Sequence, residues 1–377
     1  MGEVSFSGYY GMNNYGDDLF AITCCLAGKH YLSIDCKVVA PEMAGVESNC
    51  LVPSRLARFY SSLSFTGAML RAIFKINAVV TSSVLVLGGG STVSPRPPKV
   101  YEAAARFFSG DKALIGLGLS VEPVGNESYH RLKTFLGRFK LITLRDQASF
   151  QYVISMGLSR PRVVMARDLV GALPLFVPFK GRKESHVVGL APCNYESYFG
   201  GDLSIEKKRN EAVITAVISY AKKNKKKVRL YSLNNHPEHG DTKLVGHYYQ
   251  SLVVAGVEAE IVANSENGAL EIWHSIASCQ IFLSVRLHGA ITAYLAGLPF
   301  GLLEYHKKCT EFLNDIQLAP QFRIDEVSAK AIENLLERLE SSWTGCGVAP
   351  IQYSAEAELS FIEMRNELQR ERKRVNA

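Results

Sequence analysis

The sequence predicts an α/β protein made of two Rossmann-like domains that face a central cleft. Three observations lead to this fold class. Strand-like and helix-like segments alternate along almost the whole chain, which is typical of parallel α/β sheets. The 377 residues exceed what one hydrophobic core usually organises. A segment rich in proline, glycine and charge, residues 171–185, separates two series of strands and indicates a linker.

The first series predicts an N-terminal domain over residues 1–178. Its strands are expected at residues 4–10, 37–40, 84–89, 113–118, 141–146 and 162–168. Helices are expected between them, for example at residues 17–27, 100–108, 128–138 and 147–155. Ligand groups are expected at the carboxyl ends of the strands.

The second series predicts a C-terminal domain over residues 179–345. Its strands are expected at residues 186–192, 228–233, 260–263, 281–286 and 300–305, separated by long helices at 205–223, 242–255 and 267–278. Residues 346–377 are expected to form a helical tail. Ser354 can cap this helix, and the terminal arginines suit its negative end.

The composition is that of an ordinary globular protein, with 47% hydrophobic residues. No run of about twenty apolar residues occurs, so no transmembrane helix is predicted. No basic stretch followed by an apolar one occurs at the N-terminus, so no secretory signal is predicted. The eight cysteines include no CxxC pair, which favours buried thiols in a reducing compartment. These features predict a cytoplasmic protein.

Residues 222–229 and 365–374 carry much of the net charge of +6. Such runs are usually solvated helix ends. Attraction to an anionic membrane surface is the next interpretation, and it would place the protein peripherally at the inner face of the membrane. Nucleic acid is not predicted as a partner, because neither run is interleaved with aromatic residues or set in a known binding motif.

The first motif is the segment GYYGMNNYGDD, Gly8 to Asp18. Its glycines let the backbone turn tightly and approach a ligand. Asn14, Asp17 and Asp18 offer acceptors for sugar hydroxyls, or one carboxylate as a base. The alternative is a glycine-rich turn with an aspartate that caps the helix. The spacing is not that of a dinucleotide fingerprint.

The second motif is LGGGSTVSP, in which three glycines follow a buried strand. Gly89 and Gly90 would leave room for a ligand against the backbone. The alternative is a plain strand-to-helix turn. A P-loop is excluded because no GK[ST] follows.

The third motif places Arg145 at the carboxyl end of a strand, where it would face the cleft. Asp146 can cap the helix that follows, and the alternative is a surface ion pair between these two residues. Arg167 and Asp168, at the end of the next strand, are expected to form a structural pair.

The fourth motif is FLSVRLHGAITAYLAGLPFGLLEYHKK, residues 282–308. Arg286 and His288 stand where a strand passes into a helix, whose N-terminus favours an anion. The arginine fork suits carboxylate or phosphate, and the histidine can exchange a proton near neutral pH. The alternative is a hydrogen-bonded core histidine. Tyr305 and Lys308 return to the same rim, so these cations, with Arg145 from the other domain, could surround a small anion.

No metal site is predicted. The segment HPEH, residues 236–239, brings two histidines together, but no third ligand is indicated. No GxSxG or HExxH motif occurs.

These motifs, in this order, resemble those of the polysaccharide pyruvyl transferase family over about residues 6–320. The resemblance rests on Gly8-Tyr9-Tyr10-Gly11, Asn14, Gly16-Asp17, Gly88-Gly89-Gly90, Arg145-Asp146, Arg286-Leu287-His288, Gly297-Leu298-Pro299 and Tyr305-x-x-Lys308. Glu304 and His306-Lys307 depart from the small residue and Asp-Pro common around that tyrosine, which bears on the identity of the acceptor.

The resemblance implies a fold similar to the GT-B glycosyltransferases and a reaction with phosphoenolpyruvate as donor, without a further cofactor. The pyruvyl group would become a cyclic ketal on two hydroxyls of one sugar. The acceptor would be a polysaccharide or a precursor such as a lipid-linked oligosaccharide. Inorganic phosphate would leave.

Residue roles follow from this chemistry. Arg145, Arg286 and Lys308 would hold the donor anion. His288 would act as general acid or assist the leaving phosphate, with Lys308 as the other candidate acid. Asp17 is the candidate base on the acceptor hydroxyl. The other predicted binding residues are Asn14, Leu287, Gly89 and Gly90.

Two alternatives remain. A nucleotide-sugar glycosyltransferase of the same fold would need an acidic residue for the donor ribose, and Glu304 could supply it. A catalytically silent glycan-binding subunit would keep the fold alone. The set of Arg145, Arg286, His288 and Lys308 argues against a silent subunit.

Overall fold

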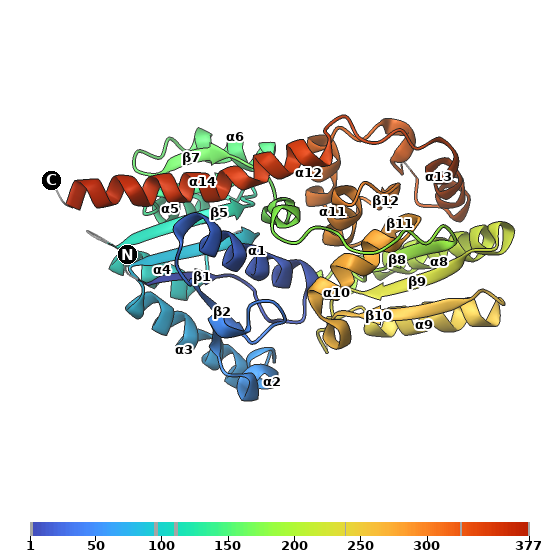
Figure 1. Ribbon diagram of the computed structural model, residues 1–377, viewed down its shortest axis with the longest axis horizontal. Helices are drawn as coiled ribbons and strands as arrows, with labels where there is room; N and C mark the ends of the chain where they lie inside the picture. The colour runs from blue at the N-terminus through green and yellow to red at the C-terminus, as the bar shows by residue number, and fades with distance from the viewer. Residues whose placement is uncertain (1–2, 94–96, 109–111, 238, 325, 376–377) are drawn as a thin grey trace. The chain divides into compact units, whose positions relative to one another are not determined.

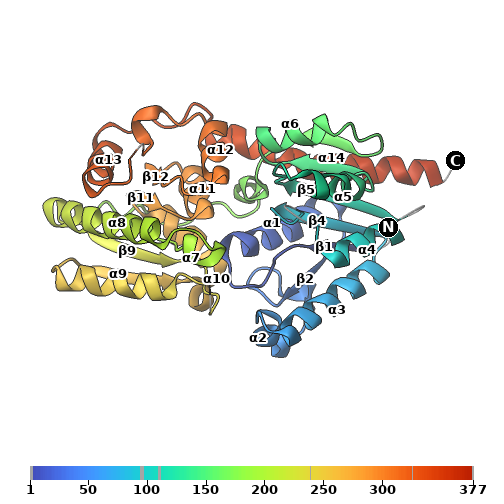
Figure 2. The same ribbon diagram turned by 180° about the vertical axis from the view of Figure 1, so that it is seen from behind.

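The computed structural model describes residues 3–93, 97–108, 112–237, 239–324 and 326–375, shown from opposite sides in Figures 1 and 2. The chain divides into two compact units. The N-terminal unit comprises residues 1–12, 17–177 and 353–377, and the C-terminal unit comprises residues 13–16 and 178–352. The chain leaves the first unit after Val177, inside the predicted linker.

The N-terminal unit contains a seven-stranded parallel sheet in the order β3-β2-β1-β4-β5-β6-β7. Its strands are β1 (Val4–Ser7), β2 (Lys37–Pro41), β3 (Cys50–Val52), β4 (Val84–Gly90), β5 (Ala113–Leu119), β6 (Leu141–Leu144) and β7 (Arg162–Met165). The strand order reverses between β1 and β4, and doubly wound sheets bind ligands beyond the carboxyl ends of the strands at such a reversal. The first two glycine motifs lie there.

Helices join these strands: most of α1 (Tyr15–Leu32), α2 (Ala57–Tyr60), α3 (Phe65–Thr81), α4 (Lys99–Phe107), α5 (Asn126–Leu136) and α6 (Gln147–Ser155). β4 and β5 are buried along their whole length, as expected of parallel strands covered on both faces. Leu85 and Leu114 of these strands share a core with Tyr101 of α4 and Phe135 of α5. Their continuous apolar runs are therefore the signal that made these strands predictable.

The last helix, α14 (Pro350–Val375), belongs to the N-terminal unit from Tyr353 onward. Ser360 and Thr143 of β6 share a buried hydrogen bond of 2.8 Å. The expectation that Ser354 caps this helix is wrong, because the helix begins four residues earlier and Ser354 is buried inside it. The predicted tail is thus a packed element of the first unit.

The C-terminal unit contains a five-stranded parallel sheet in the order β10-β9-β8-β11-β12. Its strands are β8 (Val187–Ala191), β9 (Lys227–Ser232), β10 (Ala259–Ala263), β11 (Ile281–Ser284) and β12 (Phe300–Leu302). Its helices are α7 (Glu196–Phe199), α8 (Leu203–Asn224), α9 (Thr242–Val254), α10 (Asn264–Ser278), α11 (Leu287–Leu295), α12 (Lys307–Asp315) and α13 (Ala329–Ser342). Here the order reverses between β8 and β11.

Each predicted strand is present, and β3, α3 and α13 are elements that the sequence analysis did not name. Several strands end sooner than expected: β6 at Leu144 and β12 at Leu302. Arg145 and Tyr305 therefore lie in the loops that follow these strands. None of the helices in the described part of the chain is long and apolar enough to span a bilayer.

Candidate active site

The loop between β11 and α11 is the centre of the candidate site. It leaves the sheet where the strand order reverses, the usual ligand position in doubly wound folds. Arg286 is the N-cap residue of α11, and Ser284 Oγ donates a hydrogen bond to its carbonyl oxygen (2.5 Å). The first-turn N–H groups of α11 therefore lie at this sheet edge, where the helix dipole favours an anion.

Arg286 is held by Asp241, a residue that the sequence analysis missed. Nε lies 2.9 Å from Oδ2 and Nη2 lies 2.6 Å from Oδ1, so the pair is bidentate. Asp241 is fully buried and also accepts the N–H of Asn234 (3.0 Å). Although burial disfavours the cation, the Asp241 carboxylate holds the pKa of Arg286 well above its ordinary value. The guanidinium is thus charged and fixed in orientation.

His288 packs directly against Gly16. A Cβ atom built at Gly16 would lie 2.0 Å from Nδ1 of the imidazole, far inside van der Waals contact. Both residues belong to the C-terminal unit, because residues 13–16 are part of it. The first and fourth motifs, which are about 270 residues apart, therefore meet at the histidine.

The segment 13–16 is fixed by several bonds to the C-terminal unit. Tyr15 Oη shares a buried hydrogen bond of 2.8 Å with Thr292 Oγ1, which in turn donates to the carbonyl oxygen of His288 (2.8 Å). Asn14 forms an antiparallel bridge with Asn234 in the loop after β9. Asn14 and His288 are thus positioned by one network around α11.

Tyr305 lies in the loop between β12 and α12, beside the loop after β8. Its ring packs edge-on against Tyr195, with centroids 4.8 Å apart. Tyr195 is positioned by Glu206, which accepts its backbone N–H (2.7 Å), and Glu206 lies near Arg209 (4.0 Å). Nothing in the local sequence pattern of Tyr195, Glu206 or Arg209 distinguishes them, so none of the three could be predicted as a site residue.

Lys308 lies in the first turn of α12, where its backbone N–H donates to Nδ1 of the N-cap residue His306 (3.2 Å). Its Nζ is 5.9 Å from the centroid of the Tyr305 ring. Burial raises the pKa of the Cys193 thiol to about 12, while the charges of Arg286 and Lys308 oppose that rise. Both cations are therefore within electrostatic reach of one buried atom.

Arg145 of the N-terminal unit is buried and paired. Its Nη1 lies 3.1 Å from Oδ2 of Asp168, and its Nε lies 3.9 Å from Oδ2 of Asp146. Asp146 caps α6, as predicted, by accepting the N–H of Ser149 (2.7 Å). Of the two residues expected to pair with each other, Asp168 binds Arg145 and Arg167 binds a glutamate of α14. Their mutual pair stays a prediction.

Asp17 and Asp18 differ in environment. Asp18 is buried and accepts the N–H of Gly11 (3.0 Å), so it stabilises the glycine turn. Asp17 is partly exposed. Its charge helps to raise the pKa of the Tyr9 hydroxyl, second to burial of that group. Asp17 is therefore the more exposed of the two carboxylates.

The glycines that end β4 are packed by aromatic side chains. A Cβ atom at Gly88 would lie 2.5 Å from Tyr10 Oη, and one at Gly89 would lie 2.5 Å from the Phe20 ring. Gly89 and Gly90 also have positive φ, 83° and 68°, which favours glycine. Tyr10 and Phe20 thus fill the space on the Cβ side of Gly88 and Gly89, and the binding role predicted for Gly89 and Gly90 stays a prediction. Ser94 and Pro95 of this motif lie outside the described residues.

The structure also bears on two further possibilities, a ribose-binding role for Glu304 and a metal site at residues 236–239. Glu304, a possible ribose-binding residue, is paired with Arg323, with Nε–Oε1 at 2.8 Å and Nη2–Oε2 at 2.5 Å. In the described residues no group of three or more histidine, cysteine, aspartate or glutamate side chains could hold a metal ion. Glu238 of the HPEH segment lies outside them.

The comparisons with known proteins address family and fold. A family model described as polysaccharide pyruvyl transferase matches residues 14–307. The chain belongs to the polysaccharide pyruvyl transferase family. The matched range includes Asn14, Arg145, Arg286 and His288, and Lys308 follows it directly. No curated protein matches the sequence.

Solved structures match this pyruvyl transferase family member over nearly its whole length. The UDP-GlcNAc 2-epimerase of Methanocaldococcus jannaschii has a TM-score of 0.63 at 10% identity, covering 97% of this chain and 99% of that one. A UDP co-structure of S. aureus MnaA has a TM-score of 0.64 at 11% identity, covering 98% and 96%. These similarities confirm the GT-B-like fold class. At identities of 10–11% they carry no information about function.

Proposed function

We propose that the protein transfers the pyruvyl group of phosphoenolpyruvate to one sugar of a polysaccharide or its precursor. The product would be a cyclic pyruvate ketal, and inorganic phosphate would leave. The observation that carries this proposal is the grouping of Arg286, His288 and the N-terminus of α11 at the sheet edge where the strand order reverses. The family assignment agrees with it.

The site is suited to a donor with two anionic groups. β11 and β12 are neighbouring parallel strands, so α11 and α12, which follow them, begin at the same sheet edge. Asp241 occupies Nε and Nη2 of Arg286, and in the described residues no hydrogen bond reaches Nη1. We assign Nη1, the α11 N–H groups and Lys308 to the carboxylate and phosphate of the donor.

The chemistry needs a proton at the methylene carbon and two hydroxyl attacks at C2. Protonation of the methylene carbon makes C2 oxocarbenium-like, and the first sugar hydroxyl forms a bond to C2 and loses its proton. The bond from C2 to the phosphate oxygen then breaks, and the second hydroxyl closes the ring. The proton of the second hydroxyl leaves with phosphate. The proton lost by the first hydroxyl equals the one added to the methylene carbon, so the reaction consumes no net proton.

His288 is our candidate for the acid or for assistance to the leaving phosphate, with Lys308 as the other acid. Its imidazole is fixed against Gly16 and lies in the first turn of α11. Asp17, which follows Gly16 in the chain, is our candidate base on the acceptor hydroxyl. Asn14, Leu287 and the backbone at residues 89–90 complete the proposed binding set, and Arg145 would contribute while bonded to Asp168.

A nucleotide-sugar glycosyltransferase is less well supported. The residue it requires for the donor ribose, Glu304, is engaged by Arg323. The decisive assay incubates the protein with phosphoenolpyruvate and lipid-linked, nucleotide-linked and polymeric acceptors, and follows phosphate release and acceptor mass. Gain of one pyruvyl ketal is expected. Transfer of a sugar from a UDP-sugar, with no phosphate released from phosphoenolpyruvate, would overturn the proposal.

The His288→Gln variant tests the chemical role of the histidine. Glutamine keeps a polar side chain of similar size but cannot act as an acid, so turnover should fall by about 10²–10⁴. Binding of phosphoenolpyruvate should weaken less than turnover, which separates chemistry from anion capture. His247→Gln, at an exposed position on α9, is the control and should behave as wild type. Near-normal turnover of His288→Gln would assign the acid role to Lys308.

A further inference from the structure

Helix α3 carries a row of exposed apolar side chains. Phe65, Met69, Ile73, Ile76 and Val80 are 84%, 51%, 52%, 52% and 67% exposed. Their spacing of four, four, three and four residues places them within roughly 80° of one another around an ideal helix. Single exposed apolar residues are ordinary, but a continuous row along four turns indicates a surface that contacts something.

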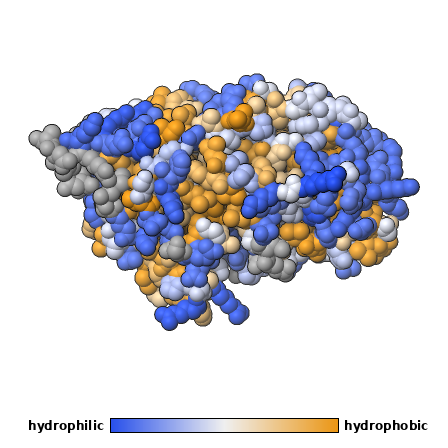
Figure 3. All heavy atoms as spheres, viewed as in Figure 1, coloured by the Kyte–Doolittle hydropathy of each residue, from blue (hydrophilic) through white to orange (hydrophobic). Residues whose placement is uncertain are grey.

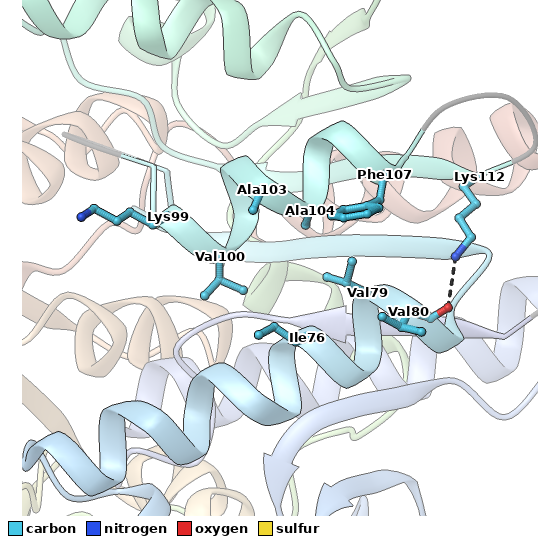
Figure 4. Close-up of a pocket in the computed structure, with 9 residues that line it drawn as sticks. All are labelled: Ile76, Val79, Val80, Lys99, Val100, Ala103, Ala104, Phe107 and Lys112. Carbon is cyan, nitrogen blue, oxygen red and sulfur yellow. Dashed lines mark hydrogen bonds between the residues drawn. The ribbon is translucent and has the colours of Figure 1, made fainter.

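The row continues into the neighbouring helices. Phe59 of α2 is 59% exposed, and Phe107 of α4 is 69% exposed. Between α3 and α4 lies a hollow of about 550 Å³, whose apolar lining includes Ile76, Val80 and Phe107. Figure 4 shows Lys99 and Lys112 at opposite ends of this hollow. We call the row together with Phe59, Phe107 and the hollow the α3 face.

The α3 face lies in a part of the chain that lacks acidic residues. Residues 48–101 contain six lysines and arginines and no aspartate or glutamate. Arg55 and Arg58, beside Phe59, are exposed. Arg96 is among the six but lies outside the described residues. The one acidic residue of α4, Glu102, is paired with Arg131. Glu3 lies at the end of α3, where its Oε1 accepts from Thr81 Oγ1 (3.4 Å), so the described charge beside the apolar row is mostly positive.

An apolar row bordered by basic residues is the pattern of a surface that lies in a membrane interface. We propose that the α3 face docks on an anionic lipid bilayer. The apolar row would enter the boundary between head groups and acyl chains, and Arg55, Arg58, Lys99 and Lys112 would contact the anionic head groups. Figure 3 shows hydrophobic residues on the face of the molecule seen in Figure 1.

Two competing roles, a dimer interface and membrane attraction through a different surface, fit the chain less well. A symmetric dimer through the α3 face would place the same basic residues against each other across the interface. The basic run at residues 222–229, which the sequence also offers for membrane attraction, is largely neutralised. Ion pairs join Lys223 to Glu337, Lys226 to Glu340, Lys227 to Glu260, and Arg229 to Glu184 and Glu260. The α3 face has no comparable set of carboxylates in its sequence.

The test is flotation of the purified protein with phosphatidylcholine vesicles that contain increasing amounts of phosphatidylglycerol. Binding of wild type should rise with phosphatidylglycerol content and fall, without vanishing, as salt is added. The Ile73→Glu/Val80→Glu variant should bind at least tenfold more weakly, because it puts carboxylates in the apolar row. Arg55→Gln/Arg58→Gln should weaken binding to anionic vesicles and reduce its salt dependence.

Two variants serve as matched controls. Val254→Glu changes an exposed valine of α9, and Lys222→Gln/Lys225→Gln changes the other basic run; both should bind as wild type. Thermal unfolding and phosphate release with a soluble acceptor, measured without vesicles, should be unchanged in all variants. These readouts separate a failure of this proposal from a failure of the proposed function.

Three results would overturn the proposal. Wild type could fail to bind anionic vesicles above the level seen with phosphatidylcholine. The Ile73→Glu/Val80→Glu variant could bind as tightly as wild type. Light scattering could instead show a wild-type dimer that this variant abolishes, with no vesicle binding, which would make the α3 face an interface between two copies of the chain.

Discussion

At the scale of single residues, the position of His288 depends on the absence of a side chain at Gly16. The φ of this glycine is not in the left-handed region, so alanine could adopt its backbone conformation. A substitution there would act through steric contact with the imidazole, because an added Cβ would lie only 2.0 Å from Nδ1 of His288. The glycine motif therefore has a role that its sequence did not reveal, which is to leave space for a histidine.

We expect Gly16→Ala to lower turnover by about 10- to 100-fold, since the imidazole must move away from its position and positioned acid–base groups are worth about 10²–10⁴. Stability should fall by about 1–3 kcal/mol, the usual cost of overpacking. Steady-state kinetics and thermal unfolding measure the two effects. Gly246→Ala is the control, because a Cβ there meets nothing within 4 Å. Unchanged turnover in Gly16→Ala would show that the position of His288 is not critical.

Substitutions of Arg286 and Asp241 should have coupled effects on the free energy of unfolding. Their effect on phosphoenolpyruvate binding should depend on Arg286 alone. Arg286→Gln or Asp241→Asn alone leaves one buried charge unpaired and should cost about 3–5 kcal/mol of unfolding free energy. The double variant, with neither charge, should recover much of that loss. Phosphoenolpyruvate binding should stay weak in every variant without Arg286. Calorimetry showing tight binding by the double variant would remove Arg286 from the donor site.

The residues that could be predicted are those whose local pattern carries the signal. Arg286 and His288 stand between a strand-like and a helix-like run, so their place at a sheet edge follows from the sequence. Asp241 has no such signal, because its importance comes from a contact with an arginine 45 residues away. The shorter ion pair of Arg145 has no local signal either, because its partner Asp168 follows the next strand of the sheet. Sequence proximity indicated only the longer contact with Asp146.

At the scale of elements, the alternation of apolar strands and amphipathic helices was enough to predict both parallel sheets. Strand ends were less well defined, because Tyr305 and its neighbours continue an apolar pattern after the hydrogen-bonded strand has ended at Leu302. Helix α14 was predicted as a helix but not as part of the N-terminal unit. Its buried positions at 353, 357, 361, 364 and 368 recur at helical spacing, a pattern that indicates a packed face.

Phe361 is the side chain of α14 whose loss should matter most. It is fully buried, and its ring stacks with Tyr31 at a centroid distance of 6.3 Å. Phe361→Ala should lower the unfolding free energy by about 3–5 kcal/mol through lost burial and a residual cavity. Leu359→Ala, at a 37% exposed position of the same helix, should cost less than about 0.5 kcal/mol. Denaturant unfolding measures both, and equal small effects would show that α14 contributes little to the first unit.

At the scale of the whole molecule, the chain places most of its candidate donor residues in one unit although they come from distant segments; Arg145 is the exception. Residues 13–16 belong to the C-terminal unit with Arg286, His288 and Lys308, while Arg145 and Asp17 belong to the N-terminal unit. The sequence could not reveal this assignment, because it depends on the bridge from Asn14 to Asn234 and the bond from Tyr15 to Thr292. If the donor binds at α11, its binding should therefore slow amide hydrogen exchange in the C-terminal unit, including residues 14–16.

Hydrogen exchange with and without phosphoenolpyruvate tests that prediction. The ligand should slow exchange of the amides at the start of α11, residues 287 and 288, because these N–H groups would bond the anion. Exchange of the amides of residues 14–16 should also slow, since these residues pack on the same helix. The Arg286→Gln/Asp241→Asn variant should lose both effects, and inorganic phosphate alone should reproduce them weakly. Slowing confined to the N-terminal unit, around residues 88–92 and 145–149, would place the donor there and contradict its assignment to α11.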